Sequence, residues 1–139
     1  KYPSTNIKIK VFVEHLKEIN KSGFEFINFE KFNTIINSKI ENNYLLLTID
    51  DAFESFYLHA WPILKEKEIP FILFVSTREV GKYGYMTWKQ IKEIDSYNFV
   101  TIGNHSHSHD YMVDWKDKEI IDDLKTSVQI FKNKSRYRK

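Results

Sequence analysis

The stretch YLLLTIDD, from Tyr44 to Asp51, decides the fold class of this chain. Its apolar run continues without alternation and stops at two acids, which is typical of a parallel strand buried on both faces. A helix is expected directly after it, over Phe53–Lys67, and Phe71–Val75 again has the pattern of a buried strand. A strand, a helix and a second strand in this order predict a right-handed crossover and a parallel sheet.

Helical and strand patterns alternate along the rest of the chain as well. The other expected helices are Ile9–Ile19, Glu30–Asn37, Thr87–Tyr97 and Trp115–Phe131, and the other expected strands are Phe24–Phe29 and Phe99–Ile102, the latter closed by Gly103. This order predicts an α/β fold whose parallel sheet is either open and doubly wound or part of a barrel. No glycine-rich phosphate loop follows any strand, which argues against a nucleotide site.

Length and composition limit the possible classes of protein. The 139 residues suit a single domain, but a complete eight-stranded α/β barrel needs about 200–250 residues. The net charge is +2, from 21 basic and 19 acidic residues, which argues against a nucleic-acid partner. The chain has no cysteine, so disulfides, thiolate catalysis and Cys-ligated zinc are excluded. No apolar run approaches about 18 residues, so no transmembrane segment is predicted.

Two polar clusters follow predicted strands and carry the residues that can do chemistry. The first is TIDDA at Thr48–Ala52, and the second is IGNHSHSH at Ile102–His109. Ligands of parallel α/β folds bind outside the carboxyl ends of the strands. Because both clusters fall there, we expect them to form one site.

Asp50 and Asp51 place two carboxylates side by side where an apolar strand stops. Their mutual repulsion and loss of water are unfavourable unless a cation lies nearby. One carboxylate could then bind the cation while the other acts as a base. The alternative interpretation is structural, because Asp51 could cap the helix that begins near Phe53.

Three of the five histidines lie within five residues, at His105, His107 and His109. On a helical turn the first and last would share a face, whereas in an extended segment all three would. One aspartate and two histidines suit Zn²⁺ with an open position for water or substrate, and the same set fits non-haem Fe(II). The alternative is a solvated polar loop.

At these residues the sequence resembles the polysaccharide deacetylases, the NodB-homology or carbohydrate esterase 4 family. The family's motif Thr-Phe-Asp-Asp-Gly corresponds to Thr48–Ala52, and its motif His-Ser/Thr-x-x-His corresponds to His105–His109. The resemblance extends from about Phe24 to the last helix. It implies a single deacetylase domain over residues 1–139, forming the N-terminal part of an incomplete TIM-like (β/α) barrel.

The resemblance also implies roles for individual residues. Asp50 would be the general base, and Asp51, His105 and His109 would bind a divalent metal, with Zn²⁺ as the expected ion. The reaction would be metal-assisted hydrolysis of N-acetyl groups on an N-acetylglucosamine-containing polysaccharide. Ser106 would brace the histidine loop, and His107 would form a wall of the site.

Some features depart from the family pattern. Ala52 replaces the family's glycine, so we expect a slightly different turn there. Arg136-Tyr137-Arg138 does not match the third motif, Arg-x-Pro-Tyr, and the motif with the catalytic-acid histidine is absent. No substrate-binding residue is assigned, although Trp88 or Tyr85 could contact a sugar; Trp61 is expected in the core.

Three rival interpretations remain. A catalytically incomplete deacetylase-like module could bind metal and glycan without turnover. A plain structural domain would show no change in thermal stability when zinc or a chelator is added. A non-haem iron oxygenase usually has a β-rich fold and a His-x-Asp motif, neither of which is visible here. Export to the periplasm, cell surface or medium is expected from the family's usual targets. The opening Tyr2–Asn6 resembles the approach segment of exported deacetylases that act on poly-N-acetylglucosamine.

Overall fold

All paired strands of the long sheet run in the same direction, as the sequence predicts. The computed structural model describes residues 6–38 and 42–134. Within them, β3 (Leu47–Ile49), β4 (Phe71–Val75) and β5 (Val100–Asn104) form a parallel sheet in the order β3-β4-β5. Most of the opening segment Tyr2–Asn6 lies outside the described residues, and so does Arg136–Arg138, which does not match the third motif.

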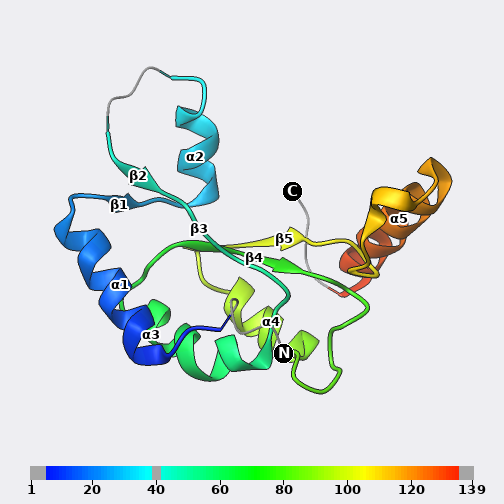
Figure 1. The fold of residues 1–139 in the computed structure, drawn as a ribbon, viewed down its shortest axis with the longest axis horizontal. Helices are drawn as coiled ribbons and strands as arrows, with labels where there is room; N and C mark the ends of the chain where they lie inside the picture. The colour runs from blue at the N-terminus through cyan, green and yellow to red at the C-terminus, as the bar shows by residue number, and fades with distance from the viewer. Residues whose placement is uncertain (1–5, 39–41, 135–139) are drawn as a thin grey trace.

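The register of this sheet brings the two polar clusters to one edge. Ile49, the last residue of β3, pairs with Leu73, and Asn104, the last residue of β5, pairs with Val75. The segments that follow β3 and β5 therefore leave the sheet at the same edge, where the carboxyl ends of its parallel strands lie. Figure 1 shows the arrowheads of β4 and β5 directed toward this edge.

The predicted single strand over Tyr44–Ile49 is divided in two. Its first half, β2 (Tyr44–Leu45), pairs in parallel with β1 (Glu25–Phe26), while its second half is β3. The prediction that it is buried on both faces is wrong, because Thr48 is exposed and its neighbours are only half-buried. In the described structure β3 lies at an edge of the sheet, whereas the central strand β4 is buried along nearly its whole length.

Two strand bounds also differ from the expectation. The strand predicted over Phe24–Phe29 is reduced to β1, because Asn28 accepts a hydrogen bond from the Lys31 amide and starts a helix there. At the other end, Gly103 does not close β5 but lies inside it, paired with Phe74. The strand thus continues to the residue before His105.

Helices occupy the expected positions. They are α1 (Ile9–Lys21), α2 (Phe29–Ile35), α3 (Trp61–Glu66), α4 (Trp88–Asp95) and α5 (Asp117–Lys134), with a π-helical segment (Phe56–Ala60) leading into α3. Side chains of Thr87 and Gln90 form a reciprocal capping box at the start of α4, which fixes where that helix begins. No helix in the described ranges is long and apolar enough to cross a membrane.

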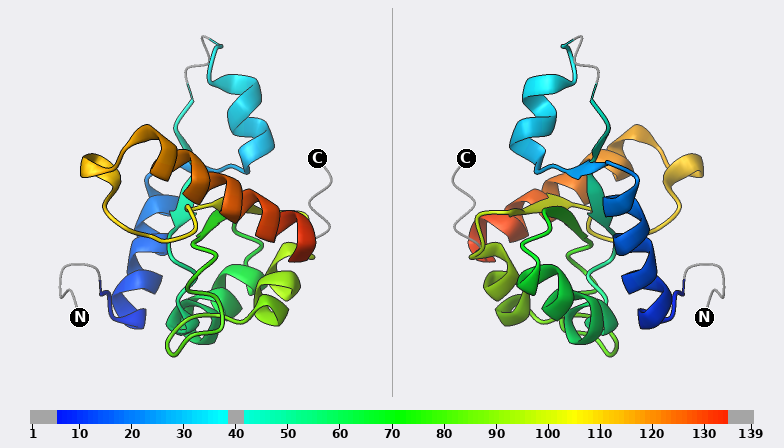
Figure 2. Two further views of the ribbon diagram at one scale, coloured as in Figure 1. Left: turned by 90° about the vertical axis from the view of Figure 1, so that its right-hand side faces the viewer. Right: turned by 90° about the vertical axis from the view of Figure 1, so that its left-hand side faces the viewer.

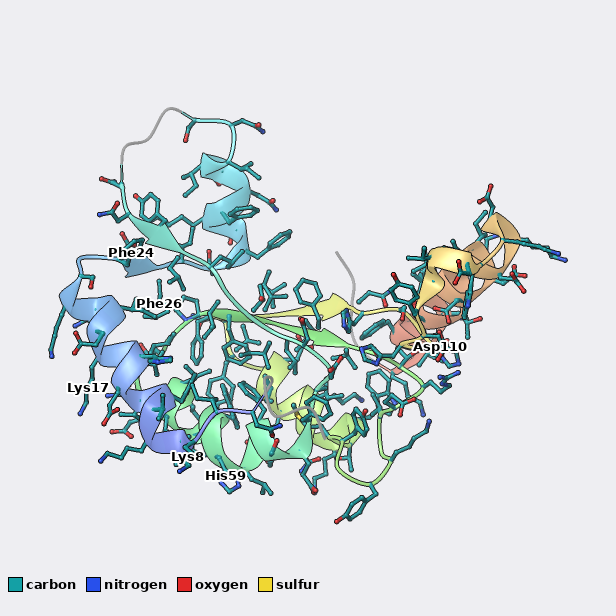
Figure 3. All side chains as sticks on the ribbon, in the orientation of Figure 1. Lys8, Lys17, Phe24, Phe26, His59 and Asp110 are labelled. Atoms are coloured by element: carbon teal, nitrogen blue, oxygen red, sulfur yellow. The ribbon has the colours of Figure 1, made fainter. Side chains whose placement is uncertain are left out.

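The helices lie at different places around the sheet. Figures 1 and 2 show α3 and α4 on one side of it, α2 on the other, and α5 beyond the ends of β4 and β5. Figure 3 shows Asp110, which follows the histidine motif, at the α5 end of the molecule. The last helix is therefore placed to contact the segment that carries the histidines.

The core lies between the sheet and the helices α3 and α4. Leu64, Leu73 and Ile94 are fully buried there. Trp61 is also buried, and its ring packs edge-on against Phe71 with 5.9 Å between ring centroids. The expectation that Trp61 belongs to the core is confirmed.

Candidate metal centre

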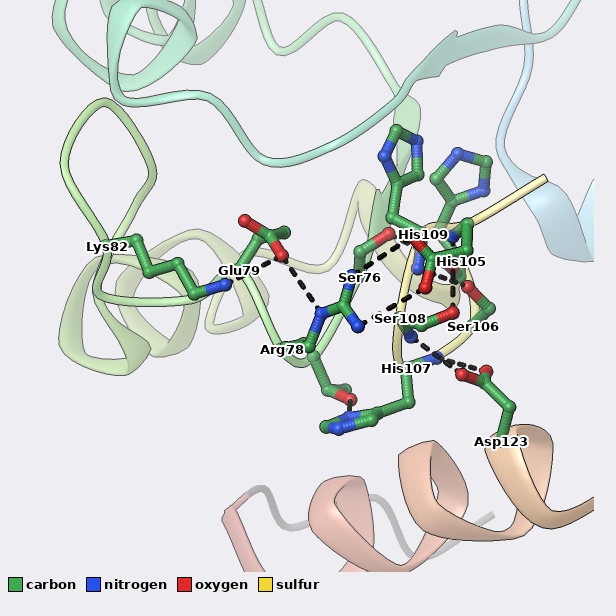
Figure 4. A network of polar contacts seen from close by, with 12 residues as sticks. Ser76, Arg78, Glu79, Lys82, His105, Ser106, His107, Ser108, His109 and Asp123 are labelled. Atoms are coloured by element: carbon green, nitrogen blue, oxygen red, sulfur yellow. Dashed lines mark hydrogen bonds and ion pairs between the residues drawn. The ribbon is translucent and has the colours of Figure 1, made fainter.

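Three of the residues singled out in the sequence meet at the edge of the sheet. Asp51, directly after β3, and His105 and His109, after β5, each offer one ligand atom, and these atoms all lie within 4.8 Å of one another. Asp51 Oδ1 is 2.9 Å from His109 Nε2 and 3.4 Å from His105 Nε2. The two imidazoles lie side by side, 5.1 Å apart between ring centroids (Figure 4). The residues from two distant motifs thus form one cluster.

The donor set fits a divalent cation. Asp51 Oδ1 is buried and makes no hydrogen bond to any described residue. A buried anionic oxygen without a partner is costly, so a positive charge at this point would be strongly stabilising. A divalent cation bound by all three side chains would supply that charge. One carboxylate oxygen and two imidazole nitrogens are ligands that Zn²⁺ accepts with a fourth position open.

Asp50 lies beside this cluster but not in it. Its side chain is exposed, and it lines a hollow of about 510 Å³ together with Asp51. A second hollow, of about 450 Å³, is lined by His105, His109 and Tyr111. The cluster therefore borders two solvent-filled recesses, and Asp50 faces one of them. A carboxylate placed there is accessible to solvent.

The alternative role of Asp51 as a helix cap is not what the structure shows. Within the described part of the chain, Asp51 makes no capping hydrogen bond, and neither does Ser55 at the start of the π-helical segment that follows. Instead Asp51 has a positive φ of 71°, in the left-handed region.

Burial, with the negative charges of Glu79 and Asp51, raises the pKa of the nearby Tyr85 phenol.

Ala52 keeps the backbone conformation of a glycine. Its φ is 53°, in the left-handed region that favours glycine. A left-handed alanine costs about 1–2 kcal/mol relative to a right-handed one. Hydrogen bonds to the segment Gly81–Met86 hold the turn: Met86 N donates to Ala52 O, and Glu54 N donates to Gly84 O, both at 2.9 Å.

The histidine loop is strained in the same way. Ser106 has a φ of 67° and His109 a φ of 60°. Ser106 braces the loop, as the family resemblance implies, because its Oγ accepts a hydrogen bond from His109 N at 3.1 Å. Non-glycine residues keep a left-handed backbone conformation only where surrounding contacts hold it, and such residues concentrate at functional sites.

His107 does not form a wall of the site. Its Nδ1 hydrogen-bonds to Thr77 Oγ1 at 2.8 Å, and Figure 4 shows the ring pointing away from His105 and His109. The alternation that would have placed all three histidines on one face is absent, because the loop is neither helical nor extended. His107 therefore helps to attach the loop to the segment after β4.

The two aromatic residues considered for sugar contact are engaged in packing. The Tyr85 ring lies on Phe53, with 5.0 Å between centroids, and Trp88 packs edge-on against Phe131 at 5.7 Å. A residue that the sequence reasoning missed is Asp123 on α5, which is buried and accepts backbone hydrogen bonds from the histidine loop. One available signal was the spacing of Asp123, which places an acid on the same face of the helix as Ser127 and Phe131.

Comparison with known proteins identifies the family of this chain. The model of the polysaccharide deacetylase family matches residues 37–139, which include both motifs. The chain belongs to the polysaccharide deacetylase family. A curated relative, YxkH of Bacillus subtilis (strain 168), whose assigned name is that of a polysaccharide deacetylase, is 23% identical over 108 residues, covering 76% of this chain and 38% of YxkH.

Solved structures show the same fold. The structure of IcaB from Ammonifex degensii matches with a TM-score of 0.84 and 23% identity, covering 96% of this chain and 64% of that one. The Streptococcus pyogenes deacetylase PplD, solved in complex with acetate, matches with a TM-score of 0.79 and 22% identity, over 96% and 63%. This chain therefore spans less than two thirds of these relatives, and the prediction of part of a deacetylase-type barrel is confirmed.

Proposed function

We propose that this chain carries the metal-binding half of the active site of a zinc-dependent polysaccharide N-deacetylase, acting on a polymer that contains N-acetylglucosamine. The observation that supports it most is the cluster of Asp51, His105 and His109 around a buried carboxylate oxygen that makes no hydrogen bond within residues 6–38 and 42–134. Membership of the deacetylase family supports the reaction class. Residues 1–139 would then form one domain of this type. Export of the protein from the cytoplasm stays a prediction.

The proposed roles follow from the positions of the side chains. Asp51, His105 and His109 would hold the cation, which when bound would supply Lewis-acid activation of water and of the acetyl carbonyl. Asp50 is exposed and faces the adjoining hollow, so its carboxylate can accept the proton of an attacking water molecule. The amide C–N bond then breaks, giving acetate and an amine that must gain a proton.

The proton donor for that amine is not among the residues assigned here. The sequence contains neither a match to the family's third motif nor the motif with the acid histidine. Activity and metal binding are therefore separate questions. Metal binding needs only residues that the structure brings together, whereas turnover also needs a proton donor.

The experiment measures metal content and acetate release on the same preparations. Zinc is quantified by elemental analysis after dialysis, and acetate is measured with an N-acetylglucosamine oligomer as substrate. Asp50→Asn should retain zinc and lose roughly 10²–10⁴-fold in turnover, the usual contribution of a general base. His109→Ala should lose zinc, and Glu66→Gln, an exposed acid on α3, is the matched control that should change neither.

The results separate the candidate functions. Zinc bound by the wild type with acetate released supports the proposal. Zinc bound without acetate release would favour a module that binds metal and glycan without turnover. A wild-type protein that binds no divalent metal would overturn the proposal, and full activity of Asp50→Asn would exclude this residue as the base.

A further inference from the structure

The side chain of Asp123 reaches from α5 to the backbone between the two histidine ligands. Its Oδ2 accepts a hydrogen bond from His107 N at 2.7 Å, and its Oδ1 accepts one from Ser108 N at 2.8 Å (Figure 4). The aspartate is 8% exposed, in contrast to its exposed neighbour Asp122. Each carboxylate oxygen thus receives one amide of the loop, in a place largely shielded from water.

A second contact from the same face of α5 holds the residue before the first ligand. Ser127, one helical turn after Asp123, is fully buried, and its Oγ accepts a hydrogen bond from Asn104 Nδ2 at 2.8 Å. The Ser127 hydroxyl in turn donates to Leu124 O at 2.9 Å, which fixes its orientation. Two polar side chains of α5 therefore attach to the loop on either side of His105.

The opposite side of the loop is attached to the segment that follows β4. Ser76 Oγ donates to His105 O at 2.7 Å, and Thr77 N donates to Ser106 O at 3.2 Å. Between these two sets of bonds, Ser106 and His109 are kept in the left-handed region. A loop released from one side would relax toward ordinary φ values, and the two imidazoles would then no longer converge on Asp51.

The charge state of Asp123 suits this task. Burial raises the pKa of its carboxyl, but the hydrogen bonds from the His107 backbone and from Ser108 outweigh burial, so the pKa lies below its ordinary value. The side chain is therefore an anion at neutral pH. Hydrogen bonds to an ionised acceptor are stronger than those between neutral groups.

We propose that Asp123, supported by Ser127, is a positioning residue that holds His105 and His109 in their metal-binding arrangement from outside the site. The inference rests on the proposed function insofar as the cluster binds a divalent metal. Asp123 touches neither metal nor substrate; it raises the fraction of molecules whose loop is ready to bind. Apparent metal affinity is proportional to that fraction.

The test compares Asp123→Asn with Asp122→Asn, which changes the adjacent exposed acid on the same helix. Zinc dissociation constants are measured by competition with a chromophoric chelator, and the Co²⁺ forms are compared by visible absorption. Asparagine keeps the size of the side chain but turns an NH₂ group toward one of the loop amides. We expect roughly 10–100-fold weaker zinc binding and an altered Co²⁺ spectrum in Asp123→Asn, the usual effect of changing a group that orients a ligand.

A second comparison separates positioning from general stability. Ile94→Val trims a fully buried core residue on α4 and should lower the thermal midpoint while leaving the zinc dissociation constant within about twofold. Hydrogen exchange of the metal-free protein gives a further readout, because the amides of His107 and Ser108 should exchange at least about tenfold faster in Asp123→Asn. If Asp123→Asn does not fold, Ser127→Ala replaces it, with weaker zinc binding again expected.

The outcomes are distinguishable. Zinc affinity and amide exchange equal to those of the wild type in the Asp123 or Ser127 variant would overturn the positioning role and leave the proposed function intact. A wild type that binds no zinc would overturn the proposed function, and the positioning role with it. Equal losses of zinc affinity in Asp123→Asn and Ile94→Val would show that Asp123 acts through stability alone, and would also overturn the inference.

Discussion

Gly103 is the point at which a single added methyl group should disturb both the sheet and the metal centre. It lies in β5, and a Cβ built on it would be 2.4 Å from Phe74 Cδ1 and 2.5 Å from Phe74 Cε1. The same Cβ would be 3.3 Å from Ile72 Cγ2. Gly103→Ala therefore forces the Phe74 ring to move. That ring lies 6.3 Å from the His105 ring, between centroids, so the ring that must move is a neighbour of a proposed ligand.

The expected loss of stability can be estimated from these contacts. Overpacking by one methyl group costs about 1–3 kcal/mol. The lower half of that range is expected, because the clashing atoms belong to a half-buried side chain that can rotate. For a chain of this size, a loss of about 1–2 kcal/mol lowers the thermal midpoint by roughly 3–10 °C. The backbone itself would not oppose alanine, since φ at Gly103 is not in the left-handed region.

A double-mutant cycle followed by circular dichroism tests the reasoning. The four proteins are the wild type, Gly103→Ala, Phe74→Ala and the double variant. Without the Phe74 ring only the 3.3 Å approach to Ile72 Cγ2 remains, which a small shift of that methyl group relieves. Gly103→Ala should then stabilise by about 0.4–1 kcal/mol through the lower entropy of the unfolded chain. The sign of its effect should thus reverse between the two backgrounds. An equal loss of stability in both would refute the assignment of the clash to Phe74.

Two further substitutions test other features of the structure. Asp95 is the last residue of α4, where the helix dipole disfavours an anion, and burial raises the pKa of its carboxyl. A raised pKa means that stability falls as the pH rises through it, so Asp95→Asn should raise the thermal midpoint at pH 7 and not at pH 3. Ala52→Gly should change the urea-unfolding free energy by less than about 1 kcal/mol, because relief of the left-handed strain offsets the lost methyl burial and the added chain entropy. A loss above about 2 kcal/mol in that assay would contradict the strained geometry at Ala52.

Local patterns in the sequence were sufficient for the elements and for their order. The continuous apolar run Phe71–Val75 became the buried central strand, and each expected helix formed within a few residues of its predicted bounds. Periodicity reports which face of an element meets the core, and capping residues report where it begins. Neither depends on distant parts of the chain, which is why both could be read without a structure.

The same patterns were misleading about burial, which depends on the neighbouring strands and helices. The run Tyr44–Ile49 has the composition of a strand buried on both faces, yet it divides between two sheets and remains partly exposed. Burial depends on which strands and helices lie alongside, and that is a property of the tertiary arrangement. For the same reason the sequence could not show that Trp88 packs against Phe131 on α5.

For the candidate site, the sequence by itself determined which two segments meet. Asp51, His105 and His109 follow strands of one parallel sheet, and such strands end at a common edge. Only the tertiary structure decided how they are held there. The left-handed φ values at Ala52 and Ser106 and the reach of Asp123 from α5 arise from hydrogen bonds between segments far apart in the chain. Residue types show which chemistry is possible, and their spacing shows which secondary structure forms. The hydrogen bonds that stabilise a strained loop exist only once those distant segments have packed together.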